Sequence, residues 1–192
     1  MTIDDTKNIL HLLMIHYPQS FKNMTLGFSK EMTLAWHRQF KEYDADEVLC
    51  AVDRIVSTDT REYVPNVAQI KQEISRIRLA NSGCLSEMDA WNMVRKAAQN
   101  SRYNAMEEYE KLSELTKRAL GTVGELRAMA DFDTNDMSYA KNNFIKSYRS
   151  VVNSEIIRMS NQYSFPSRDD VRFLSDLNEL DDNKKGFIPL DK

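Results

Sequence analysis

The chain has 192 residues, a formal net charge of −3 and 42% apolar residues. This length suits one medium domain or two small helical ones, and it excludes a large multidomain enzyme. The 26 basic and 29 acidic side chains nearly balance, which argues against a dedicated nucleic-acid binder with its usual basic excess. Only five Gly and four Pro occur, and this scarcity of helix breakers favours an all-α fold.

Cysteine content and hydropathy indicate an intracellular protein that does not enter a membrane. Cys50 and Cys84 have no CxxC partner, so we interpret them as reduced structural thiols. No segment approaches the ~18–20 uninterrupted apolar residues of a membrane span. Asp4 and Asp5 stand where a signal peptide would carry Lys or Arg. We therefore expect a cytoplasmic protein.

Residues 1–80 are predicted to form a compact four-helix domain. One helix face is predicted at i, i+3, i+4 and i+7 by Ile9, Leu12, Leu13 and His16, and Pro18 follows as a stop. A second helix is expected to begin near Ser29, and a third after a cap at Asp44 or Asp46. A fourth begins at Pro65 and Asn66. Each helix is too short to be stable alone, so the four apolar faces must pack together.

The segment Asn81-Ser82-Gly83 is the predicted boundary to a second helical unit over residues 86–158. Ser86-x-x-Asp89 has capping-box spacing and starts its first helix. Residues 103–131 are predicted to hold two more helices, the second beginning at Thr122-x-x-Glu125. A long helix then runs from about Met137 to Met159, with Phe144, Tyr148 and Val151 on one face.

Residues 160–192 are predicted to form an amphipathic helix and a partly flexible C-terminal segment. Apolar side chains with the spacing of a helix face lie among acidic residues, namely Phe173, Leu174, Leu177 and Leu180. Such a stripe suits the groove of a partner protein. A terminal helix packed on the second unit explains the same pattern equally well.

No motif of an enzyme or metal site is present in the sequence. GxxxxGK[ST] and GxGxxG are both absent. Asp131-x-Asp133-x-Asn135 resembles the start of a calcium loop, but Asp136 replaces the required Gly. We interpret it as a turn whose side chains cap the long helix. The expectation is therefore no catalytic residue, no cofactor and no metal.

Two helix faces carry candidate DNA contacts. The first belongs to the fourth helix and the second to the helix that follows Ser86; together they hold Lys71, Arg76, Arg78, Arg95, Lys96 and Arg102. Each face has three formal cations, and the electrostatic gain scales with the number of phosphates neutralised. These two faces predict DNA binding that is weak and salt-sensitive, or no DNA binding. The same charges are better explained as those of ordinary solvent-exposed helix faces.

One arrangement of apolar and aromatic residues resembles a known family. It runs through Leu12-Leu13, Tyr17-Pro18, Trp36 to Tyr43 and Val48 to Ile55, and ends with Val64-Pro65-Asn66-Val67-Ala68-Gln69-Ile70. Over about residues 5–80 it resembles the N-terminal domain of the SPP1-type helicase loader/inhibitor proteins of phages of Gram-positive bacteria. The unit at 86–158 is additional to that family's pattern.

The resemblance implies a non-enzymatic phage DNA replication factor in the bacterial host cytoplasm. Its partner would be a DnaB-type replicative helicase, of the host or of a phage, which the protein loads or inhibits. A phage origin-binding protein would be a further partner. Family members engage the helicase through a C-terminal segment, which makes Phe173, Leu174, Leu177 and Leu180 the helicase-binding candidates.

Two alternative functions remain open. A replisome organiser would bind origin DNA directly, with a steep salt dependence carried by the arginines of the two basic faces. A host-takeover protein would block a host factor without any stimulation of helicase loading.

Overall fold

The computed structural model describes residues 1–162, and every regular element in that range is helical. This confirms the all-α fold class. The predicted C-terminal helix and flexible segment, with the candidates Phe173, Leu174, Leu177 and Leu180, lie outside the described residues. Within the described range the chain divides into two compact units, Met1–Val67 and Ala68–Ser160.

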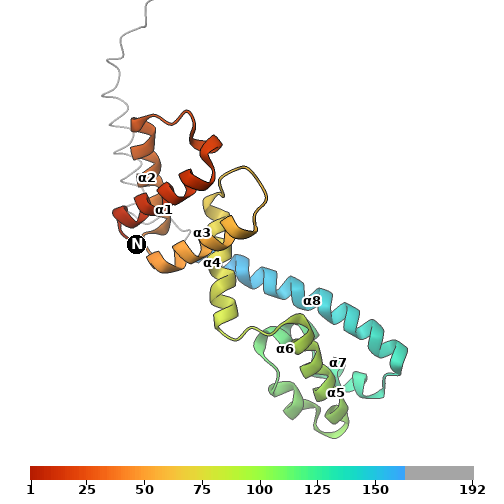
Figure 1. Cartoon of the computed structure of the whole chain (residues 1–192). Helices are drawn as coiled ribbons and strands as arrows, with labels where there is room; N and C mark the ends of the chain where they lie inside the picture. Colours follow the sequence, from red (N-terminus) through yellow and green to blue (C-terminus); the bar gives the residue numbers. More distant parts are fainter. Residues whose placement is uncertain (163–192) are drawn as a thin grey trace, which may run out of the picture. The chain divides into compact units, whose positions relative to one another are not determined.

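The first unit contains helices α1 (Ile3–His16), α2 (Leu26–Phe40) and α3 (Ala45–Thr58), with a short 3-10 helix η1 (Pro18–Phe21) after α1. Helix α1 contacts both α2 and α3 (Figure 1). Buried side chains include Leu13 of α1, Phe40 of α2, and Val48 and Val52 of α3. The centre of the Phe40 ring lies 5.8 Å from that of Trp36, so the predicted Trp36–Phe40 stripe does pack.

Helix starts in the first unit follow from short polar side chains. Thr2 and Asp5 form a reciprocal capping box on α1, and the Asp44 carboxylate accepts a hydrogen bond from the backbone of Asp46 at the start of α3. Helix α2 begins at Leu26 rather than near Ser29, because the Thr25 hydroxyl accepts from the Phe28 N–H. The prediction for α2 was therefore about one turn late.

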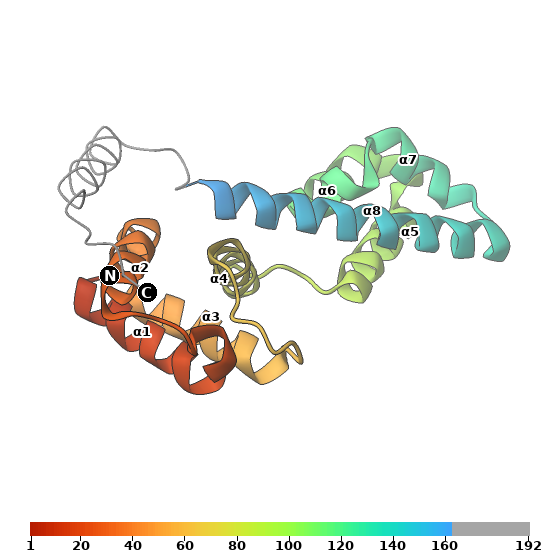
Figure 2. The ribbon, with the colours of Figure 1, turned by 90° about the horizontal axis from the view of Figure 1, so that it is seen from above.

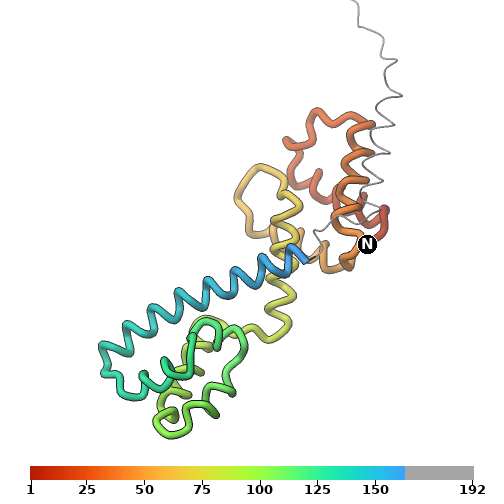
Figure 3. Tube along the Cα trace, turned by 180° about the vertical axis from the view of Figure 1, so that it is seen from behind, coloured from red at the N-terminus to blue at the C-terminus, as the bar shows by residue number. Residues whose placement is uncertain are grey.

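The second unit contains α4 (Val67–Asn81), α5 (Glu87–Glu110), α6 (Glu114–Leu120), α7 (Val123–Ala128), the 3-10 helix η2 (Met129–Asp131) and α8 (Thr134–Asn161). Helix α8 lies alongside α5, α6 and α7 (Figures 2 and 3). One buried core joins α5, α6, α7, η2 and α8. It is built from Ala90, Trp91, Val94, Ala97, Ala98, Leu112, Leu120, Leu126, Met129, Phe144 and Tyr148. The predicted Phe144/Tyr148 face is therefore the core face of α8.

The second unit has a helix break near one predicted helix start and confirms three predicted caps. The helix predicted to begin at Tyr103 is present in part: the backbone leaves helical geometry at Asn104, with φ −121° and ψ 35°, and a second helical segment follows to Glu110 before α6 begins at Glu114. Ser86 caps α5, Thr122 and Glu125 form the predicted capping box on α7, and Asp133 accepts from the Asp136 N–H at the start of α8. The Asp131–Asn135 segment therefore caps the long helix α8, as we predicted from its Asp and Asn side chains.

Gly83 lies just after α4 with φ +83°, a left-handed conformation that favours glycine. The predicted stop at Asn81-Ser82-Gly83 is therefore a real helix end. The compact units, however, divide earlier, at the start of α4. The predicted domains, which end at residue 80 and begin again at residue 86, stay predictions, because the division into compact units does not establish which segment folds independently.

Candidate functional surfaces

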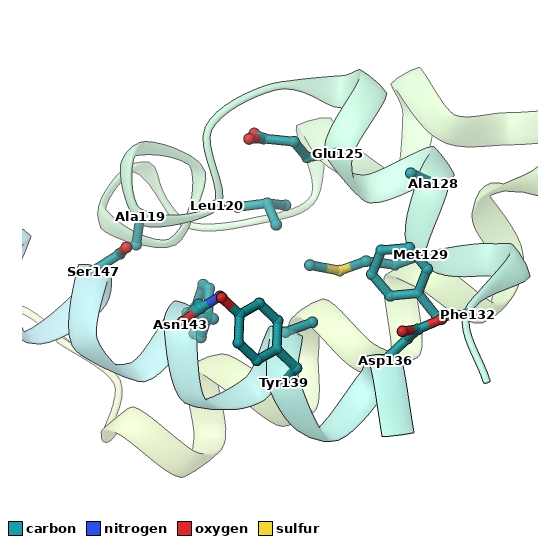
Figure 4. A pocket seen from close by; sticks show the side chains of 12 residues that line it. Ala119, Leu120, Glu125, Ala128, Met129, Phe132, Asp136, Tyr139, Asn143 and Ser147 are labelled. Carbon is teal, nitrogen blue, oxygen red and sulfur yellow. The ribbon is translucent and has the colours of Figure 1, made fainter. Parts of the chain in front are cut away.

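The second unit has an open groove of about 450 Å³ between α8 and the segment from α6 to η2. Its apolar lining comes from Ala119, Leu120, Ala128, Met129, Phe132, Ala140 and Phe144. Figure 4 shows the Tyr139 ring projecting from α8 toward this space, with Leu120 and Met129 beside it and Glu125 on the far side. We call this surface the α8 groove.

The α8 groove is built by helical periodicity. Asp136, Tyr139/Ala140, Asn143/Phe144 and Ser147 follow one another at i, i+3/i+4, i+7/i+8 and i+11 along α8. At 1.5 Å per residue this stripe is roughly 16 Å long, or about three turns. Alanine on α6, α7 and α8 leaves the depth of the groove open, because a methyl side chain fills little of it.

The charge of the α8 groove is negative. Its two acidic residues are Glu125 and Asp136, and none of its lining residues, all within 1–162, is Lys or Arg. The Glu125 carboxylate accepts from the Thr122 N–H at 2.6 Å, which fixes its position while leaving its charge in place. Tyr139 is 71% exposed and Phe132 38% exposed. The groove therefore offers a wall of apolar and aromatic surface with carboxylates at its edge.

The α8 groove was not predicted from the sequence. Its signal there is only a second stripe on the long helix, Tyr139 and Asn143 beside Phe144, which is polar in part and does not look like a core face. The other wall comes from α6, α7 and the residues that follow them, earlier in the chain. Only the folded arrangement brings the two walls together.

The DNA-contact candidates of α4 do not form one exposed cationic face. Lys71 is buried at 5% exposure, and burial lowers the pKa of its ammonium group. Arg76 donates to the Glu73 carboxylate at 2.9 Å. Arg78 is half-buried. A phosphate backbone would therefore meet little of the positive charge that the sequence places on this helix.

The candidates of α5 are more accessible. Arg95 and Lys96 are exposed, and Arg102 forms an ion pair with Asp131. Arg95 lines a second groove of about 420 Å³ between α5 and α8, together with Gln99, Lys141 and the rings of Trp91 and Phe132. Among residues 1–162, neither Arg95 nor Lys141 has an ion pair. Asp133 also lines this groove and offsets part of the charge.

In the first unit, the Tyr17-Pro18 motif borders a polar cleft of about 500 Å³. Asp59 and Arg61 face it through a two-point ion pair, with Arg61 donating at 2.6 and 2.8 Å. This pair lowers the pKa of the Asp59 carboxyl. Burial raises the pKa of the Tyr17 hydroxyl, and the Asp59 charge adds to this. The residues that line this cleft include no nucleophile paired with a base.

Within residues 1–162, no three His, Cys, Asp or Glu side chains lie close enough together to hold a metal ion. Over the same range, no helix has both the length and the apolar character needed to cross a bilayer.

Comparison with known proteins locates the relationship in the first unit. Residues 1–71 match the family model for the N-terminal domain of the helicase loader/inhibitor of phage SPP1. A search of curated proteins found no match, and neither did a search of solved structures. The family match ends inside α4, so most of the second unit lies outside it. Residues 1–71 are thus similar to the N-terminal domain of that loader/inhibitor, which confirms the resemblance that the apolar and aromatic spacing predicted.

Proposed function

We propose that this protein is a non-enzymatic phage replication factor that binds a DnaB-type replicative helicase and loads or inhibits it. The observation that carries the proposal is the match of residues 1–71 to the N-terminal domain of a helicase loader/inhibitor. The surfaces of the second unit fit such a role, because they are grooves and helix faces suited to holding a macromolecule.

The proposed contact with the helicase is the stripe Phe173, Leu174, Leu177 and Leu180. Its spacing is that of an amphipathic helix, whose few apolar anchors supply most of the affinity in helix-in-groove binding. Six acidic residues and one basic residue lie in 169–182. Their charge would speed encounter with a basic groove and make the association rate fall with salt.

Binding is tested by size-exclusion chromatography with light scattering. The full chain is mixed with the DnaB-type helicase of a Gram-positive host, with and without ATP. We expect a stable complex that the double variant Phe173→Ala/Leu177→Ala loses. The matched control is Tyr103→Ala/Met106→Ala on α5, two large side chains at 91% and 64% exposure. This control should bind as the parent does.

Three results would change the proposal. Binding that survives Phe173→Ala/Leu177→Ala keeps the function and moves the interface to the helical units. A complex that forms without raising helicase recruitment to single-stranded DNA favours inhibition or host takeover over loading. Absence of a complex with both host and phage helicases refutes the proposal.

Direct DNA binding is a second candidate, supported by one exposed cation of α5 and one half-buried cation of α8. Arg95 and Lys141 line one groove beside Gln99 and the Phe132 ring, and neither has an ion pair among residues 1–162. Two neutralised phosphates predict a slope of log K against log salt of about −1.4 to −1.8. Charge removal by Arg95→Gln/Lys141→Gln should flatten that slope. An unchanged slope would place any DNA contact elsewhere.

A further inference from the structure

We propose that the α8 groove is a docking site for a cationic amphipathic helix of a partner protein. The proposal concerns the second unit, outside the family match, and goes beyond the proposed function. Shape, surface chemistry and charge support it separately.

The shape of the groove fits a helix. Its α8 wall presents side chains at i, i+3/i+4, i+7/i+8 and i+11 over about three turns. A docking helix places its anchors at the same intervals, so two helices lying side by side match over this length. The three alanines Ala119, Ala128 and Ala140 let a partner helix approach closely, as small residues do at helix contacts.

The surface chemistry fits apolar anchors. Leu120, Met129 and Phe144 form a floor that belongs to the buried core, so the floor is rigidly held. Tyr139 at 71% and Phe132 at 38% exposure leave aromatic area in water. Aromatic side chains at the centre of an interface carry much of its binding energy. A flexible thioether at Met129 adapts to anchors of different shape.

The negative charge of the groove favours a positively charged partner. Glu125 and Asp136 line the groove with no Lys or Arg among its lining residues. Neither carboxylate forms an ion pair with another residue of 1–162. A helix with Lys or Arg beside its apolar stripe would pair with both, whereas an acidic helix would be repelled. This argues against the acidic stripe at 169–182 as the occupant.

The test uses the full chain and three synthetic peptides. The first carries Leu at i, i+4 and i+7 with Lys at the exposed positions; the second replaces each Lys by Glu; the third scrambles the first at constant composition. Binding is followed by fluorescence anisotropy, and the site by amide chemical-shift changes. We expect the Lys peptide to bind and to shift amides of Ala128, Asp136, Tyr139 and Asn143.

Two variants and a control test the named side chains. Tyr139→Ala removes an exposed anchor and should weaken binding about tenfold, as interface hot spots do. Asp136→Asn should weaken it about threefold at low salt and have no effect near about 1 M salt, where exposed charges are screened. Tyr103→Ala removes an equally large exposed ring outside the groove. It should leave the affinity unchanged.

Several results would overturn the proposal. Equal binding of the Glu peptide would show that the groove does not discriminate by charge. Equal binding of the scrambled peptide would show that it does not recognise the apolar spacing. Shifts confined to other surfaces would place the peptide elsewhere. Groove shifts that grow with chain concentration would identify a second copy as the occupant. Groove shifts caused by Phe187→Ala/Leu190→Ala without peptide would identify the chain's own C-terminal residues.

Discussion

Replacing Tyr148 by Phe should weaken the second unit measurably. The Tyr148 hydroxyl donates to the Leu85 carbonyl at 2.9 Å, joining α8 to the segment before α5. Phe keeps the ring, which stacks on Phe144 at 5.7 Å, and removes this bond together with the 3.7 Å contact between the hydroxyl and the Cys84 thiol. Leaving a buried acceptor without its partner costs about 1–3 kcal/mol. Leu85 is half-buried, and the Cys84 thiol also donates to its carbonyl at 3.7 Å, so we expect about 1–1.5 kcal/mol.

The same variant should change how stability depends on alkaline pH. Burial, and secondly the Cys84 thiol, raises the pKa of Tyr148. In the unfolded chain a tyrosine ionises near about pH 10. The unfolded state therefore loses this proton first, so the contribution of Tyr148 is complete below pH ~10 and falls as pH rises further. The fall is at most about 1.4 kcal/mol per pH unit, and the Phe variant lacks it.

The measurement is urea unfolding followed by Trp91 fluorescence in a Trp36→Phe background. Trp91 lies in the core of the second unit, with its ring 5.7 Å from Phe144, so the signal reports that unit. Tyr103→Phe is the matched control, because Tyr103 is 91% exposed. An equal loss in Tyr103→Phe, or a loss below about 0.3 kcal/mol in Tyr148→Phe, would refute the hydrogen-bond argument.

Three further changes test local features of the second unit. Gly121→Ala should destabilise it by about 1 kcal/mol or more, because Gly121 has φ +100° and a Cβ there would clash with the Glu125 carboxylate; thermal unfolding measures the loss. Gly124→Ala should raise stability by about 0.5–1 kcal/mol in the same assay, since Gly124 is helical and its Cβ would have ordinary contacts. Glu155→Gln should flatten the loss of stability on acidification between pH 4.5 and 2, because hydrogen bonds from two arginines lower the pKa of Glu155 to about 2.

Helix positions were predictable wherever a local signal marks them. Pro18, Asp44 and Gly83 each end or begin a segment through a conformation or a hydrogen bond that the residue itself dictates. The start of α2 was missed because Thr25, a cap, was overlooked in favour of the apolar stripe that begins later. The predicted start at Tyr103 lies next to the break in helical geometry at Asn104. The separate start of α6 at Glu114, where the Ser113 hydroxyl caps the helix, was not predicted.

The candidate surfaces were less predictable than the helices. Lys71 has the spacing of an exposed cation, yet packing buries it. The α8 groove depends on what is absent from its lining, namely large side chains at Ala119, Ala128 and Ala140. The spacing of residues along one helix predicts which of them lie on the same face. It does not predict whether another helix covers that face or leaves it exposed. Tertiary packing alone decides this.

The α8 groove and the C-terminal stripe that we propose for helicase binding both carry negative charge. The groove carries Glu125 and Asp136 at an apolar surface, and residues 169–182 combine apolar anchors with a net negative charge. Surfaces of like sign repel at contact, so each is better suited to a basic apolar surface of a partner than to the other. If one partner offers basic surface to both, the two sites act together, and the effective concentration of the second contact makes the joint affinity exceed either alone. Tyr139→Ala would then weaken helicase binding more in the presence of Phe173 and Leu177 than in the Phe173→Ala/Leu177→Ala background, a coupling that a double-mutant cycle measures directly.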